Sequence, residues 1–142
     1  MKTLKPWMVV PTALATILMS AGVASSAPIP IAPGFNPDPL QFKGMSGGAQ
    51  ASNNCGMIGA APNHVLSLGG NFNYLRFNLH SDGGQPTLLI QTPSGSSCVQ
   101  ADRFSGGTIQ APGYWEQGTY SIYVGDRSGG QHPYTLSITQ KP

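Results

Sequence analysis

Charged side chains are scarce in this chain of 142 residues, since Asp, Glu, Lys and Arg together make up only 8% of it. Coiled coils and long solvent-exposed helices depend on repeated Glu and Lys, so the composition excludes both. Nucleic-acid binding by phosphate neutralisation needs clustered Lys and Arg, whereas the 7 basic residues here are scattered. We therefore expect no nucleic-acid partner.

Apolar runs long enough to cross a bilayer comfortably are also lacking. The apolar run Met8–Met19 contains Pro11 and falls short of the ~20 residues that a membrane helix needs. Lys2 and Lys5 precede this run and small residues follow it, which is the layout of a secretory signal peptide. We assign residues 1–27 to such a signal and expect a secreted or periplasmic protein with no transmembrane anchor after cleavage.

Cleavage of the signal changes the net charge of the chain. Two cleavage points stay open, one after Ser26 and the other after Ala27. Either cut removes Lys2 and Lys5, so that 5 of the 7 basic residues remain and balance the 5 acidic residues. The mature chain is then nearly neutral, and electrostatic steering toward a charged partner is weak.

Cysteine is rare, and both cysteines, Cys55 and Cys98, lie beyond the signal. In an oxidising compartment an even pair indicates a disulfide. The alternative is a metal site, but no Cys-x-x-Cys or His spacing supports it. A bridge would close a loop of about 44 residues, which the chain-entropy model values at about 4 kcal/mol.

Glycine and proline, by contrast, are abundant, with 19 and 13 residues. Prolines crowd residues 28–39, and because proline lacks a backbone donor we expect an extended leader there rather than a strand inside a sheet. Residues 41–54 are rich in Gly, Ser and Asn, which is typical of a loop. The sequence thus predicts a leader over 28–54 and an ordered domain over 55–142.

Short apolar stretches recur between turn signals in the second part of the chain, and several alternate with the period of 2 that is typical of half-buried strands. No window has a helical period with caps. The stretches are His64–Leu68, Phe72–His80, Thr87–Thr92, Ser97–Gln100, Thr108–Gln110, Thr119–Val124 and Tyr134–Thr139. This pattern, with a turn at Pro112-Gly113, predicts an all-β fold: an antiparallel β-sandwich of about seven to eight short strands with one disulfide.

Motifs for catalysis are weak. The segment Gly44–Gly48 matches the G-x-S-x-G pattern of a nucleophile elbow, but it lies in a Gly/Ser-rich loop where chance matches are expected. Acid–base chemistry by His64, His80 or His132 needs a partner carboxylate, and each of these histidines lies at a strand edge or turn. Glycosidases generally need two placed carboxylates, and the acidic residues here are few. We expect a protein without enzymatic activity, with a hydrolase as the less favoured alternative.

Asp82, Asp102 and Asp126 are the candidates for metal binding. Asp82 and Asp126 lie in Gly-rich turns, where Asp commonly caps its own backbone. Calcium needs several oxygen ligands, usually with carboxylates among them. We expect no cofactor, with a weak calcium site through one of these residues and backbone carbonyls as the alternative.

Tyr114, Trp115 and Tyr123 are the candidates for ligand binding. Exposed Trp and Tyr rings stack on sugars or anchor a protein partner. For Trp115 the favoured alternative is a place in the core, where the chain enters the next strand. Tyr123 lies on the polar face of its predicted strand, so it is the better surface candidate.

Several stretches carry a resemblance to a known family. They are Tyr74–Leu79, Thr87–Ile90, Pro93–Cys98, the Gly-Thr-Tyr strand within Trp115–Gly125, and the closing Tyr134–Ile138. Over about residues 64–140 the chain resembles the bacterial pre-peptidase C-terminal (PPC) domain, in a stand-alone form similar to small secreted proteins of cyanobacteria.

The resemblance implies an exported, non-catalytic, jelly-roll-like sandwich of the kind usually appended to secreted proteases. Some relatives bind calcium, or collagen-like and polysaccharide matrices. Members often carry an acidic pair after the position of Cys98, and here only Asp102 is acidic, which argues against calcium. We expect a binding module for a protein or polysaccharide of the envelope or extracellular matrix. The alternative is a structural envelope protein that associates with itself through edge strands.

Overall fold

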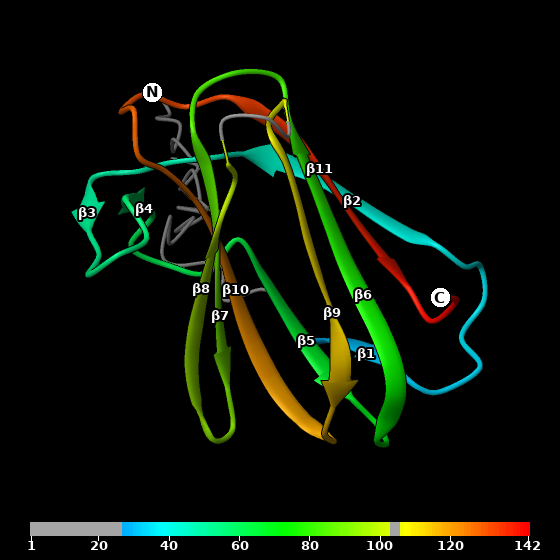
Figure 1. Ribbon diagram of the computed structural model, residues 1–142. Coiled ribbons are helices and arrows are strands. Elements are labelled where there is room, and N and C mark those ends of the chain that lie inside the picture. The colour runs from blue at the N-terminus through cyan, green and yellow to red at the C-terminus, as the bar shows by residue number, and fades with distance from the viewer. Residues whose placement is uncertain (1–26, 103–105) are drawn as a thin grey trace, which may run out of the picture.

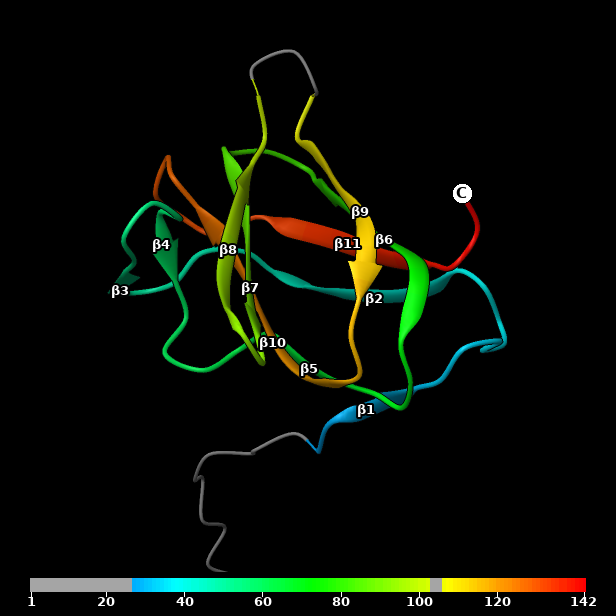
Figure 2. The same cartoon turned by 60° about the horizontal axis from the view of Figure 1, so that its bottom comes forward.

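Two β-sheets packed face to face make up the protein in the computed structural model, which describes residues 27–102 and 106–142 (Figures 1 and 2). All the secondary structure in these ranges is strand, eleven in number, and none of it is a helix able to cross a membrane. The predicted signal peptide lies almost wholly outside the described residues.

The strands divide unequally between the sheets. In the larger sheet, β5 (His64–Leu68) and β7 (Pro86–Thr92) flank the long strand β10 (Gly118–Asp126). Four further strands complete this sheet: β1 (Ile29–Ile31), β3 (Gln50–Ala51), β4 (Met57–Ile58) and β8 (Gly95–Gln100). The smaller sheet runs in the order β2 (Leu40–Met45), β11 (Pro133–Thr139), β6 (Phe72–Ser81) and β9 (Thr108–Trp115). Only the pairing of β1 with β5 is parallel among the described strands.

The core is built from the alternating apolar residues of both inner faces. In β6, β10 and β11 the predicted inward residues are buried, and they meet between the sheets. Those of β6 and β11 are Leu75, Phe77, Leu79, Tyr134, Leu136 and Ile138. Facing inner surfaces of this kind are what hold an aligned β-sandwich together, so the predicted all-β sandwich is confirmed.

Residues 28–54 differ from the sequence-based expectation. Strand β2 pairs with β11 over six residues, and Leu40 and Phe42 pack against the core. Strand β1 pairs with β5, and Ile31 is buried. The expectation of a leader before an ordered domain at Cys55 is therefore corrected. Both strands lie at sheet edges, where proline and short length are tolerated, and this is why the local composition concealed them.

The end of β9 also corrects a prediction. The sequence indicated a turn at Pro112-Gly113, yet β9 continues through both residues to Trp115. Strand β9 is the edge of the smaller sheet, where a missing backbone donor can face solvent. Its pairing with β6 shifts register between Phe72 and Leu75, as a β-bulge does.

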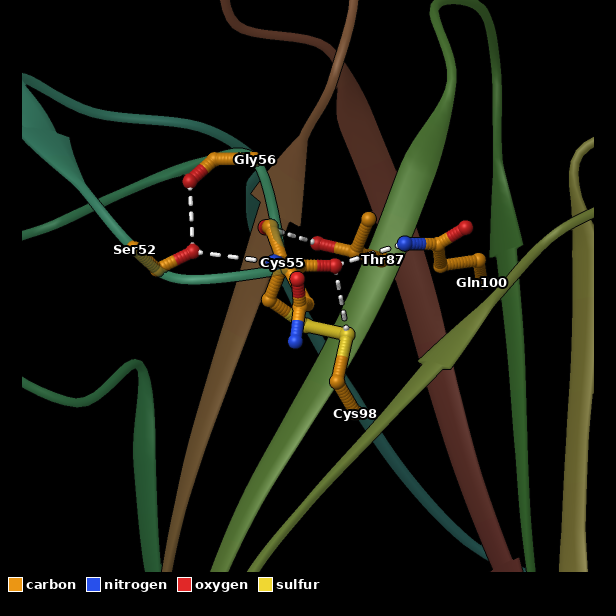
Figure 3. The surroundings of a disulfide bond; sticks show 7 residues. Ser52, Cys55, Gly56, Thr87, Cys98 and Gln100 are labelled. Atoms are coloured by element: carbon orange, nitrogen blue, oxygen red, sulfur yellow. Dashed lines mark hydrogen bonds between the residues drawn. A yellow bond between two sulfur atoms is a disulfide. The ribbon is translucent and has the colours of Figure 1, made fainter.

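The predicted disulfide is present between Cys55 and Cys98, whose Cα atoms lie 5.8 Å apart (Figure 3). Two hydrogen bonds fix the same loop: the Thr87 hydroxyl donates to the Cys55 carbonyl at 2.6 Å, and the Gln100 side chain donates to the Asn54 carbonyl at 2.6 Å. The bridge thus ties the segment before β4 to the edge strand β8, and the Thr87 hydrogen bond ties the same segment to β7.

Removal of this disulfide by mutation measures its contribution to stability. The two cysteines are 43 residues apart, so replacing both by serine should lower the free energy of unfolding by about 2–4 kcal/mol. Urea denaturation of the variant and of the oxidised protein measures the difference. Alkylation of both thiols in the unreduced protein would contradict the bridge.

Candidate functional site

An aromatic groove of about 220 Å³ lies between the β7–β8 turn and the β9–β10 turn. Both turns lie at the lower end of the sandwich in Figure 1. The residues that line it are Thr92, Pro93, Ser94, Tyr114, Trp115, Glu116 and Tyr120. We call this feature the aromatic groove. It brings together two of the three aromatic residues that the sequence singled out for binding.

Trp115 is half-buried and firmly held. Its ring packs edge-to-face against Phe77, with centroids 4.8 Å apart, and against Tyr120 at 5.7 Å. Its indole N–H donates to the Leu75 carbonyl at 3.0 Å. Trp115 therefore packs against the core, as the favoured alternative had it, and at the same time forms part of the groove wall.

Tyr114 is the exposed aromatic residue of the groove, with 56% of its surface accessible. Behind it, the Tyr120 hydroxyl donates to the Glu116 carbonyl. Burial and the Glu116 carboxylate raise the pKa of Tyr120, so this phenol stays protonated and acts as a donor. The groove thus combines an accessible ring, a fixed indole and the Glu116 carboxylate, a combination suited to stacking and to hydrogen bonding with hydroxyl groups.

Tyr123 lies elsewhere. It is half-buried in β10, directly across from Leu89 of β7, and its neighbours Ile122 and Val124 point into the core. Tyr123 therefore faces outward from the larger sheet and is absent from the lining of the aromatic groove. The consecutive residues Tyr114 and Trp115 thus line one groove, and Tyr123 lies on a separate surface.

Asp126, at the end of β10, has no accessible surface. Its Oδ1 accepts hydrogen bonds from the Gln85 backbone N–H at 3.2 Å and from the Ser128 N–H and hydroxyl at 2.7 and 2.5 Å. Its Oδ2 lies 2.9 Å from Nδ1 of His132, which donates because a carboxylate only accepts. A Cβ at Gly84 would collide with this carboxylate. Asp126 thus joins two loops that the sequence showed only as separate turns.

These hydrogen bonds decide the ionisation of Asp126. Burial by itself would raise the pKa of this carboxyl group. The hydrogen bonds from Ser128, from the Gln85 backbone and from His132 outweigh burial and lower the pKa below 3.8. Asp126 is therefore ionised at neutral pH and fully used by protein donors, so it is not placed to serve as a calcium ligand.

The other two candidate metal ligands lie apart from Asp126. Asp82 is exposed and faces His80 at 3.6 Å, and Asp102 is exposed beside a different cleft. Within residues 27–102 and 106–142, no three His, Cys, Asp or Glu side chains are grouped to hold a metal ion. The described residues thus provide no carboxylate cluster of the kind that calcium favours.

The cleft beside Asp102 lies at the end of the sandwich that carries the β6–β7 and β8–β9 connections. It encloses about 780 Å³ and has a largely polar wall that includes Gln85, Gln100, Asp102 and Arg127. Two glycine pairs, at 83–84 and 106–107, supply backbone to the same wall. Sequence reasoning missed this cleft because glycine-rich turns carry no side-chain signal for a site.

The three histidines occupy three unrelated places. Burial lowers the pKa of His64, whose Nε2 lies 2.8 Å from the Tyr134 hydroxyl. His64 lies at the start of β5, the strand-edge position that the sequence indicated. His80 is exposed, and His132 pairs with Asp126. Ser46, from the G-x-S-x-G match, is fully buried and its hydroxyl accepts the His132 backbone N–H at 3.1 Å. Ser46 is therefore engaged by backbone and shielded from solvent.

Comparison with known proteins shows similarity in sequence to a cyanobacterial protein and a fold shared with a solved structure. No family model matches the chain. An uncharacterised protein of Synechococcus elongatus is 40% identical over 132 residues, covering 89% of this chain and 92% of its own length. The pre-peptidase C-terminal domain of a collagenase from Bacillus anthracis has a similar structure, with a TM-score of 0.53 and 16% identity, over 83% of this chain and 100% of that one.

A more distant likeness is to a periplasmic inhibitor of g-type lysozyme from Aeromonas hydrophila, with a TM-score of 0.38 and 15% identity over 78% of this chain and 95% of that one. The collagenase domain is the likeness that bears on the fold. The PPC-like sandwich expected from the sequence is thereby confirmed.

Asp126 predicts an acid-sensitive contribution to stability. The pKa of Asp126 is lower in the folded chain than its ordinary value of 3.8. Its contribution to stability is therefore complete at pH values above 3.8, and it is lost as the pH falls through the pKa of the folded chain. Asp126→Asn should lower the free energy of unfolding by about 1–3 kcal/mol at neutral pH, and the difference from wild type should shrink on acidification. Urea denaturation across this pH range measures it.

Asp82→Asn is the matched control, since Asp82 is exposed and forms only a long contact with His80. It should change stability little at any pH. If the loss in free energy of unfolding caused by Asp126→Asn stayed constant down to the lowest pH, this would contradict the lowered pKa of Asp126.

Proposed function

Since the chain belongs to the same family as the uncharacterised Synechococcus elongatus protein and has the fold of a PPC domain, we propose that it is an exported, non-catalytic binding module. Its ligand is a polysaccharide or a protein of the envelope or extracellular matrix. The aromatic groove is the binding site, with Tyr114 as the accessible contact and Trp115 as the fixed wall.

The observation that carries this proposal is the exposure of Tyr114 on a rigid base. Tyr114 is 56% exposed. In the described part of the chain, the large hydrophobic side chains that are exposed are those of Tyr114 and Met45. Its neighbour Trp115 is immobilised by two aromatic contacts and one hydrogen bond. A preorganised aromatic surface loses little entropy on binding, and a neutral chain needs such a surface because charge contributes little to its recognition.

Export is supported by two independent features. The N-terminal sequence has the layout of a signal peptide, and Cys55 and Cys98 form a disulfide. Disulfides form and persist in oxidising compartments. We place the mature chain in the periplasm or outside the cell.

The absence of a catalytic role is supported by the state of the reactive side chains. Ser46 is buried, and Asp126 is saturated by donors. His64 is used by Tyr134. A nucleophile and its base must both reach a substrate, and these groups are committed to holding loops and strands together.

Tyr114→Ala tests the site. In co-sedimentation with insoluble polysaccharides, peptidoglycan and envelope fragments, the wild-type protein should pellet with one of them, and Tyr114→Ala should lose most of that binding. Stacking contacts of this kind contribute about 0.5–1.5 kcal/mol beyond their buried area, so affinity should fall at least several-fold. Unfolding by urea should be unchanged because Tyr114 is exposed.

Tyr123→Ala is the matched aromatic control, since Tyr123 lies outside the groove. It should bind like wild type. Loss of binding in Tyr123→Ala with retention in Tyr114→Ala would move the site to the outer face of the larger sheet. Failure of the wild-type protein to pellet with any of these materials would overturn the matrix-binding proposal.

A further inference from the structure

Five strands of the described structure lie at sheet edges: β1, β3 and β8 in the larger sheet, and β2 and β9 in the smaller one. An edge strand presents unpaired backbone N–H and C=O groups, which are a template for pairing with another chain. Natural proteins protect such edges with short length, proline, lysine or bulges, so an unprotected edge is informative.

Four of the five edges carry such protection. Strand β1 has three residues and contains Pro30, and β3 has only two residues. Strand β2 carries the exposed Lys43. Strand β9 contains Pro112 and departs from regular register with β6.

Strand β8 carries none of these features. Its six residues, Gly95–Gln100, include neither proline nor a charged side chain. It pairs with β7 in unbroken register over its whole length, and Ser96 and Ser97 are exposed. Figure 1 shows the hairpin that joins β7 and β8, and β7 is the only described strand that pairs with β8.

The position of β8 is held by contacts on the face of the sheet. Cys98 is bonded to Cys55, and the Gln100 side chain donates to the Asn54 carbonyl (Figure 3). Cys98 lies directly across from Leu89 of β7, so both contacts reach over the sheet rather than along the outer edge of β8. The edge is thus fixed in an extended form, which lowers the entropy cost of pairing.

We propose that β8 pairs antiparallel with β8 of a second copy of this chain, which joins two larger sheets across a two-fold axis. In such a pairing, residues near the axis face their own counterparts. Any charge there would meet a like charge, which is destabilising in a cross-strand pair. The side chains of β8 are all neutral and so satisfy this requirement of self-pairing, whereas Lys43 in β2 does not.

A second feature lies beside the same strand. A groove of about 280 Å³ on the face of the sheet is lined by Leu89 and by Ser96 and Cys98 of β8. Addition of a strand from a second copy extends the sheet next to this groove. The half-buried Leu89 and the disulfide of the two copies then lie on one continuous surface.

The test uses the disulfide-bonded protein and the central exposed residue of β8. In sedimentation velocity over a concentration series, the wild-type mass should rise from one chain to two. Ser97→Lys and Ser97→Glu should each stay at one chain, because like charges then meet across the axis. An equimolar mixture of the two variants should recover the dimer, since opposite charges now pair. This recovery also rules out misfolding as the cause of the loss.

Gln110→Lys is the matched control, because Gln110 is exposed on β9, the edge of the other sheet. It should dimerise like wild type, as should Tyr114→Ala. A wild-type protein that remains one chain at every concentration would overturn the proposal and leave β8 as an edge for an extended segment of another protein. Dimerisation of Ser97→Lys at wild-type concentrations, or a mixture that remains monomeric, would overturn it as well.

Discussion

The backbone pairing of β10 is the constraint on which the larger sheet depends. One side of this strand pairs with β5 along its first half, and the other side pairs with β7 along its second half. Its last residue, Asp126, also pairs with β4 and receives the side-chain hydrogen bonds that hold two loops. At its N-terminal end β10 adjoins the aromatic groove, which is lined in part by Glu116 and Tyr120. A shift in β10 would therefore disturb both ends of the sandwich.

The scarcity of charged residues limits the interactions available at each end of the sandwich. The one carboxylate with no accessible surface, among the described residues, is surrounded by donors, as a buried charge must be. The opposite end offers aromatic rings, an indole fixed by hydrogen bonding and few charges. The binding proposed for this chain would therefore use stacking, hydroxyl contacts and backbone pairing. The proposed site adjoins the proposed self-pairing strand, because Thr92, Pro93 and Ser94 line the aromatic groove and lead directly into β8.

Much of this could be predicted from the sequence, and the exceptions have a common origin. Alternation in Phe72–His80 and Tyr134–Thr139 is a local property, and both became strands with the expected inward faces. The strands in residues 28–54 and the continuation of β9 through Pro112 depend on which strands lie at an edge. Which strands lie at an edge depends on pairing between segments far apart in the chain, and local composition does not predict such pairing.

The sequence by itself determined the all-β class and the inward residues of the long strands, because alternation is a local property. It also predicted the disulfide, because an even pair of cysteines in an exported chain indicates a bridge and two cysteines allow one pairing. Tertiary structure alone decided the sites. It placed the β7–β8 turn and Tyr120 beside the consecutive residues Tyr114 and Trp115, and it left Tyr123 on another face. It buried Asp126 among donors from two loops and made β8 the unprotected edge. These outcomes follow from register and sheet order, which are set by contacts between segments far apart in the chain.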